Sequence, residues 1–181
     1  CKKAFAKCAK IKEIVYEDES MLQIIHKKAF QNLNIQSITI PKRVKCICEK
    51  AFECSMLNKI EFEKHSKLEK IGSYAFSKTE IEKITIPYRV KEISIGAFDG
   101  CKNLKEIEFL EDSKLQRIKT DAFSSTEIQS ITIPANLVEF KINWFKETSH
   151  LKEIKLQEDS KYFKYYDDKF IIGKQNQKNN D

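Results

Sequence analysis

The sequence has little glycine, little proline and no long hydrophobic run. Four Gly and three Pro among 181 residues exclude a glycine-rich phosphate loop and a flexible linker, and they argue against a turn-rich barrel. No apolar stretch approaches the roughly 18 to 20 residues that a membrane helix needs, so we expect no membrane insertion by this chain. An initiator Met and a signal peptide are also absent. We therefore interpret the chain as a piece of a longer protein, truncated at its N-terminal end.

Charged residues of both signs are abundant but are not segregated along the chain. The sequence contains 33 Lys and Arg and 27 Asp and Glu, which gives a net charge of +6. Because the two signs are interspersed, the composition favours a solvated charged surface over a nucleic-acid-binding one, and we expect no nucleic-acid partner. A basic outer surface that contacts nucleic acid or anionic glycans is kept as a minor alternative.

An Ala-Phe pair recurs along the chain at nearly constant spacing. The pairs are Ala4-Phe5, Ala29-Phe30, Ala51-Phe52, Ala75-Phe76, Ala97-Phe98 and Ala122-Phe123, and Trp144-Phe145 takes the seventh place. Successive Phe residues are 25, 22, 24, 22, 25 and 22 residues apart, which indicates a unit of two turns. One such turn cannot bury its apolar side alone. The spacing therefore predicts a solenoid of stacked turns with one internal file of Phe rings.

A second motif, apolar-x-x-apolar-x-apolar, follows each of these pairs. It occupies residues 11–16, 35–40, 57–62, 81–86, 104–109, 128–133 and 151–156. Its last four residues alternate with period two, as in a half-buried strand. We predict a mainly β solenoid of about seven turns of 22–25 residues, with a parallel sheet on its concave face and short irregular or helical returns.

Together these motifs resemble the leucine-rich repeats of the BspA-like type, and the similarity covers roughly residues 1–160. It rests on segments such as LNKIEF (57–62) followed by LEKIGSYAF (68–76), in fixed order and repeated at least six times. One departure is that Pro41, Pro87 and Pro134 stand where many leucine-rich repeats end the strand with Asn or Cys.

The resemblance implies a function as well as a fold. Proteins of this family occur in host-associated bacteria and in some protozoan parasites. The family implies a non-enzymatic protein-interaction module, the ligand-binding or adhesion region of a cell-surface protein whose partner is a host or neighbouring-cell surface protein. The alternative is an intracellular, cytoplasmic scaffold of the same repeat, because reduced cysteine is the norm in the cytosol.

The repeat pattern ends before the chain does. We expect residues 1–157 to form the solenoid, 158–173 a hairpin that caps its last turn, with Asp167 and Asp168 at the bend, and 174–181 a disordered polar tail. The start of another repeat array is the alternative to a cap. An open N-terminal end could also allow self-association through its strand edge.

The cysteines and histidines do not form a recognisable chemical site. Cys8, Cys54 and Cys101 occupy equivalent positions two turns apart, about 9.6 Å from strand spacing and beyond the roughly 7 Å Cα limit of a disulfide. We predict six free thiols, mostly small buried fillers. A zinc site formed by Cys46, Cys48 and Cys54 lacks a fourth ligand, and no Ser/His/Asp or Cys/His arrangement is present. We predict no enzyme activity, no cofactor and no metal.

The outward residues of the predicted strands are the candidate site. The predicted partner-binding residues of the concave face are Glu13, Val15, Thr39, Lys59, Glu61, Lys83, Thr85, Glu106, Glu108, Thr132, Glu153 and Lys155. The outward positions also include Ser37, Ser130 and the residues at the strand ends, such as Glu17 and Glu63. Together, all outward positions hold seven Glu and three Lys, a net charge of −4. We therefore expect an acidic face that suits a polar or basic protein surface. Solubility alone is the alternative role for these side chains.

Overall fold

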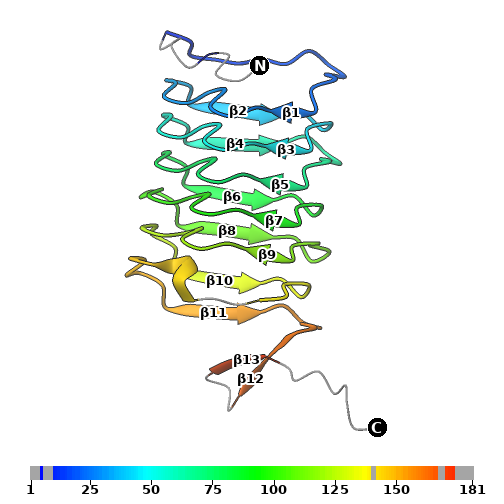
Figure 1. The fold of residues 1–181 in the computed structure, drawn as a ribbon, viewed down its shortest axis with the longest axis vertical. Coiled ribbons are helices and arrows are strands. Elements are labelled where there is room, and N and C mark those ends of the chain that lie inside the picture. Colours follow the sequence, from blue (N-terminus) through cyan, green and yellow to red (C-terminus); the bar gives the residue numbers. More distant parts are fainter. Residues whose placement is uncertain (1–4, 6–9, 140–141, 167–169, 174–181) are drawn as a thin grey trace.

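The chain winds into a single stack of turns, which Figure 1 shows with the N-terminal turns at the top. The structure is a computed structural model, and it describes residues 5, 10–139, 142–166 and 170–173. The predicted polar tail, 174–181, and the predicted bend at Asp167 and Asp168 lie outside the described residues.

Each turn between residues 35 and 156 contributes one long strand. The long strands are β2 (Ser37–Ile40), β4 (Lys59–Phe62), β6 (Lys83–Ile86), β8 (Glu106–Phe109), β10 (Ser130–Ile133) and β11 (Glu153–Leu156). Their residues alternate between exposed and buried, as at Ser37 to Ile40, so one side of every strand faces the core. These strands occupy six of the seven predicted segments. The prediction was wrong for residues 11–16, which form no strand.

The returns carry a second parallel sheet that the sequence did not predict. Its two-residue strands are β1 (Ile24–Ile25), β3 (Cys46–Ile47), β5 (Lys70–Ile71), β7 (Glu92–Ile93) and β9 (Arg117–Ile118), hydrogen-bonded in that order. The only helix in the described part of the chain is the short 3₁₀ helix η1 (Ile142–Phe145) in the last return. The predicted mainly β solenoid is confirmed.

The Ala-Phe corner forms a third set of bonds between turns. From Ala29-Phe30 to Ala122-Phe123, the residue before each pair and the second residue after it have positive φ, as at Lys50 (57°) and Cys54 (56°). The left-handed conformation is energetically unfavourable for an L-residue. Here it orients the backbone N–H groups of three alternate residues toward the next turn. Lys50, Phe52 and Cys54 donate their backbone N–H groups to Ser73, Ala75 and Ser77 at 2.8–2.9 Å. Backbone bonding therefore recurs at this corner with the same period as the sequence motif.

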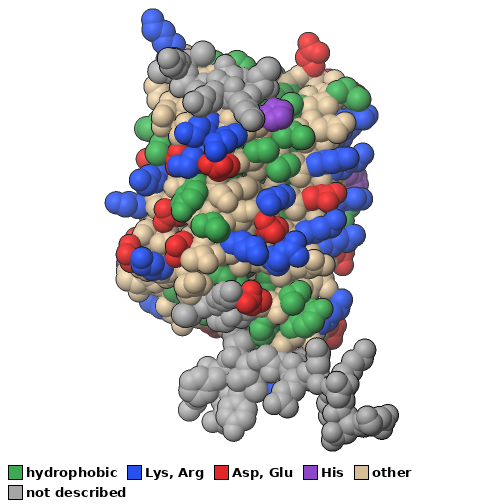
Figure 2. All heavy atoms as spheres, in the orientation of Figure 1, with side chains coloured by type: hydrophobic (Ala, Val, Ile, Leu, Met, Phe, Trp, Pro, Cys, Tyr) green, Lys and Arg blue, Asp and Glu red, His purple; other side chains and the backbone are tan. Residues whose placement is uncertain are grey.

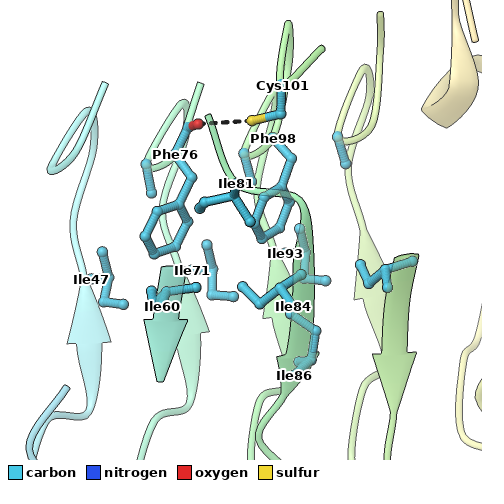
Figure 3. Close-up of a cluster of buried hydrophobic side chains, with 14 of the residues drawn as sticks. Ile47, Ile60, Ile71, Phe76, Ile81, Ile84, Ile86, Ile93, Phe98 and Cys101 are labelled. Carbon is cyan, nitrogen blue, oxygen red and sulfur yellow. Dashed lines mark hydrogen bonds between the residues drawn. The ribbon is translucent and has the colours of Figure 1, made fainter. Parts of the chain in front are cut away.

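The Phe rings form the predicted internal file. From Phe5 to Phe145 each ring stacks on the next with centroids 5.1–5.7 Å apart, and Phe145 takes the seventh place as expected. Figure 3 shows Phe76 and Phe98 side by side above the isoleucines of the two sheets, with the Cys101 thiol donating to the Phe76 carbonyl at 3.0 Å. The core is thus one continuous apolar column.

Two kinds of turn alternate after the long strands. The turns after β2, β6 and β10 begin with Pro and close with a bond such as Val44 N–H to the Pro41 carbonyl, 3.0 Å. The turns after β4 and β8 have seven residues before the next short strand instead of five, and a buried Ser66 or Ser113 hydroxyl accepts a backbone N–H inside each. The alternation explains the two-turn unit in the sequence.

The long strands are hydrogen-bonded in separate pairs. β2 pairs with β4, β6 with β8 and β10 with β11, all parallel. Within the described residues no strand ladder continues from β4 to β6 or from β8 to β10. The first residues of the long strands are 22, 24, 23, 24 and 23 positions apart, and the two steps of 24 are the two breaks.

The C-terminal segment departs from the repeat after Lys161. The Lys161 N–H donates to the Ala135 carbonyl at 3.0 Å, as equivalent Lys residues do in earlier turns. β12 (Phe163–Tyr166) and β13 (Phe170–Gly173) then form an antiparallel pair, drawn beyond β11 in Figure 1. Phe163 is buried and belongs to the core. Capping of the stack by residues 158–173 stays a prediction.

Candidate functional site

The outward side chains of the long strands form one continuous surface, here called the strand face. It consists of Ser37, Thr39, Lys59, Glu61, Lys83, Thr85, Glu106, Glu108, Ser130, Thr132, Glu153 and Lys155. Ten of the twelve predicted site residues lie on it. All of these are exposed except Thr85, which is half-buried. Glu13 and Val15 precede the first strand and do not belong to the face.

The charges of the strand face largely neutralise one another. The strand register places Lys83 opposite Glu106, with 2.5 Å between Nζ and Oε1. Thr85 donates its hydroxyl to Glu108 at 2.8 Å. Lys59 and Glu61 pair within one strand at 2.8 Å. Such exposed pairs add little stability, but they leave the face with no strong field of one sign.

The predicted acidic excess is not found on the strands. The face holds four Glu against three Lys, a net charge of −1. Three of the acidic residues counted in the prediction lie elsewhere: Glu13 and Glu17 precede the first strand, and Glu63 follows β4. Glu63 is half-buried, and its carboxylate accepts the Lys42 backbone N–H at 2.9 Å. The face is therefore a nearly neutral, hydrogen-bonding surface.

A groove of about 590 Å³ crosses the strand face at the break between β4 and β6. Its lining includes the apolar residues Phe62, Pro87, Tyr88 and Leu110, here called the floor, together with Lys64 and other charged side chains. Phe62 is half-buried although the equivalent residues of β2, β6, β8 and β10 are buried. No sequence motif predicted this groove, and the available signal was the longer step between these two strands.

The turns after β2, β4 and β6 form a basic margin beside the groove, here called the basic edge. In residues 41–45, 63–69 and 87–91, seven Lys and Arg face two Glu, a net charge of +5. In Figure 1 the long strands run toward the right-hand edge, and Figure 2 shows Lys and Arg side chains concentrated there. Part of this charge is matched, since Lys42 pairs with Glu19 and Lys91 with Glu69.

The second sheet carries a cluster of charged side chains around the partly buried Glu92. The Glu92 carboxylate accepts hydrogen bonds from Lys70 (2.9 Å), Ser94 (2.9 Å) and Arg117 (3.1 Å) of its own and adjoining turns. Partial burial by itself would raise the pKa of Glu92, but these three donors outweigh it and lower the pKa to about 2. The cluster links three neighbouring turns. We interpret its role as stabilising the stack rather than as binding or catalysis.

The cysteines and histidines are dispersed in the folded chain. Cys46, Cys48, Cys54 and Cys101 are free thiols, and Cys1 and Cys8 lie outside the described residues. Among the described four only Cys101 is buried, so the prediction of mostly buried fillers was wrong for the other three; Cys54 is exposed because it occupies an outward left-handed corner. No three His, Cys, Asp or Glu side chains of the described chain are placed to hold a metal. Likewise, the described part contains no helix long and apolar enough to span a membrane.

Comparison with known proteins matches the repeat directly. The model of the BspA type leucine rich repeat region matches residues 1–94 and 69–167, with six copies. The comparison with curated proteins returned no match.

Three solved structures share the fold. The chain is 30% identical to the pneumococcal vaccine antigen PcpA, with a TM-score of 0.79 over 84% of this chain and 40% of that one. It is 24% identical to a leucine rich cell surface protein from Faecalibacterium prausnitzii, with a TM-score of 0.58 over 85% of this chain and 48% of that one. It is 23% identical to a leucine-rich repeat protein of T. pallidum, with a TM-score of 0.69 over 77% and 65%. The chain thus spans less than two thirds of each of these proteins.

Proposed function

The chain belongs to the BspA-type leucine-rich repeat family, and from this we propose that it is a non-enzymatic protein-binding module whose strand face contacts the partner. We propose further that the module serves adhesion at a cell surface, with a host or neighbouring-cell protein as its partner. The observation that carries the proposal is the distribution of side chains: most apolar residues are buried in the core, and the outward side chains of the long strands form one broad, exposed polar face.

The chemistry of the strand face supports a protein partner. Its exposed hydroxyl, carboxylate and ammonium groups stand at fixed spacing on a rigid sheet. Preorganised side chains lose little entropy on binding, which favours affinity. A net charge near zero removes the phosphate-neutralising term that dominates binding to nucleic acids, and this favours protein over nucleic acid as the ligand of this face.

The proposed location rests on relatives. The Faecalibacterium prausnitzii structure is that of a cell surface protein, and the pneumococcal protein is a vaccine antigen. The intracellular scaffold is the second candidate, and the free thiols of Cys46, Cys48, Cys54 and Cys101 favour it. Fractionation of the source cells, followed by protease treatment of intact cells, separates the two, because only a surface module is cleaved.

The binding role is tested with variants of the strand face. The chain is immobilised and exposed to surface-labelled host or neighbouring cells, and bound proteins are quantified by mass spectrometry. The double variant Glu108→Lys/Thr132→Arg changes two exposed side chains on β8 and β10, away from the groove. The matched control Lys102→Glu/Lys146→Glu changes two exposed side chains outside the strand face.

We expect the strand-face variant to reduce capture of specific partners by about tenfold or more, as loss of interface contacts does, and the control to retain it. Equal capture by the strand-face variant and the unaltered chain would contradict the proposed role of this face.

A further inference from the structure

We propose that the groove between β4 and β6 binds an acidic polypeptide segment that carries one bulky apolar side chain. The inference rests on the proposed protein-binding function and specifies the chemistry of the partner. The apolar side chain occupies the floor of the groove, and the neighbouring carboxylates of the segment contact cations at the basic edge.

The floor of the groove is apolar surface at a place where the repeat normally has none. Leu110 is 39% exposed, whereas the other seven-residue turn begins with Glu63 and the remaining turns begin with the buried Pro41, Pro87 and Pro134. Phe62 and Tyr88 add two half-buried rings to the same groove. Aromatic residues in a recess are enriched among the contacts that dominate protein interfaces. A single bulky side chain of a partner would cover this surface.

The carboxylates within the groove are already engaged. Glu61 pairs with Lys59 at 2.8 Å, and Glu63 accepts the Lys42 N–H. Lys83, another residue of the lining, pairs with Glu106. These contacts leave the acidic groups of the groove with little capacity to recruit a basic ligand.

Cations beside Tyr88 are, by contrast, available to an incoming anion. Lys64 lines the groove and forms no ion pair with any residue that the structure describes. Arg89 lies with its Cζ 5.3 Å from the centre of the Tyr88 ring, and its Nε contacts the Tyr88 hydroxyl at 2.6 Å. Lys114 from the next turn lies 5.9 Å from the same ring. Lys64 thus lies in the lining of the groove, and Arg89 and Lys114 lie against Tyr88, another residue of that lining.

The next turn limits this basic surface. Glu111 and Asp112 follow Leu110 in the turn after β8, so the carboxylates of the segment would be repelled from these two residues and directed toward the cations beside Tyr88 and the turns after β4 and β6. A sulfated polysaccharide would use the cations but would leave the apolar floor uncovered. The combination of an apolar recess and a flanking positive rim therefore favours a polypeptide as the occupant.

The test uses a random-peptide phage library panned on the folded chain at physiological salt. Selected peptides are synthesised with a fluorescent label, and their binding is measured by anisotropy. We expect selection of peptides that contain Phe, Trp or Leu flanked by Asp and Glu. Leu110→Ser and Lys64→Glu, both at exposed positions, are expected to weaken binding by about tenfold each. The controls Val138→Ser and Lys105→Glu change exposed side chains that do not line the groove and are expected to leave it unchanged.

Three results would overturn the proposal. One is selection of peptides without acidic residues, and another is binding that survives both groove variants. The third is retention of the chain on heparin that Lys64→Glu abolishes and Leu110→Ser does not alter, because the ligand would then be an anionic polysaccharide. If cell-surface partners are lost by Glu108→Lys/Thr132→Arg but retained by both groove variants, the proposed function stands and the groove proposal fails.

Discussion

Lys114 is joined to Tyr88 of the preceding turn in two ways. Its backbone N–H donates to the Tyr88 carbonyl at 2.8 Å, and its Nζ lies 5.9 Å from the centre of the Tyr88 ring. The backbone bond recurs between other turns, as from Lys67 to Lys42 and from Lys161 to Ala135, and of these three acceptors only Tyr88 carries an aromatic ring. The repeat therefore sets the backbone hydrogen bonds between turns, whereas side chains that differ from turn to turn, such as Tyr88, give individual turns their own contacts.

The Phe file should dominate the stability of the stack. Phe76 is fully buried and stacks on Phe52 and Phe98 at 5.2 and 5.4 Å. Phe76→Ala removes a ring that both neighbours contact, and we expect it to lower the free energy of unfolding by about 3–5 kcal/mol. Urea denaturation followed by circular dichroism measures the change. Met56→Ala, at an exposed site, is the control, and a similar small cost for both variants would contradict the central role of the file.

Gly72 is required by the close approach of two turns. A Cβ atom at this position would lie 2.7 Å from the Ile47 carbonyl oxygen and 2.8 Å from the Cys48 carbonyl carbon. Because both atoms are backbone, neither can move aside without disturbing the second sheet. Gly72→Ala is expected to cost about 1–3 kcal/mol by overpacking, measured by thermal unfolding. The neighbouring Ser73→Ala should cost much less, and equal melting temperatures for the two variants would refute the steric explanation.

Glu92 should make the stability of the stack depend on pH below neutrality. Its pKa in the folded chain is about 2, below the ordinary 4.5, so its contribution is present above the unfolded pKa and is lost as pH falls from about 5 toward 2. With its side chain only 16% exposed, we expect Glu92→Gln to cost about 2 kcal/mol at neutral pH and almost nothing near pH 2.

The measurement is a series of urea unfolding curves across that pH range. Glu106→Gln is the control, because it removes an exposed pair with Lys83 and should cost less than about 1 kcal/mol. A Glu92→Gln deficit that stays constant with pH would show that the charge of Glu92 is not what stabilises the three turns.

The described thiols should differ sharply in reactivity. Cys54 is exposed, whereas Cys101 is fully buried and burial raises its pKa to about 11, which keeps it protonated and unreactive. With iodoacetamide at neutral pH, peptide mass spectrometry should find Cys54 modified well before Cys101, and both modified after denaturation. Similar rates in the folded chain would mean that the turn around Cys101 opens readily.

The parts of the fold with a clear period in the sequence were predictable, and the short strands of the second sheet were not. The Phe spacing predicted a file of rings because a buried residue that recurs once per turn has to stack on its equivalents, as Phe76 and Phe98 do. The second sheet was missed because a two-residue strand such as Lys70–Ile71 is too short to show a period of two. Its residues look like an irregular return.

The candidate site was predictable in its membership but not in its shape. Alternation along each strand placed Thr39 and Glu61 correctly on the outward side. The same rule misplaced Glu63, because the chain turns directly after Phe62 and the Glu63 carboxylate bonds the Lys42 backbone instead. The groove arises from a break between two strand pairs, which is a relationship between turns that no single motif contains.

The most direct measurement of the central claim is a lysine footprint of the chain with a captured partner bound. Acetylation of each Lys is quantified by mass spectrometry in the free and bound chain. If the strand face and its groove contact the partner, Lys59 and Lys64 will be protected, while Lys119 beside the second sheet and Lys102 will react as in the free chain. Protection of Lys119 with unchanged labelling of Lys59 and Lys64 would place the partner on the opposite sheet and contradict the account.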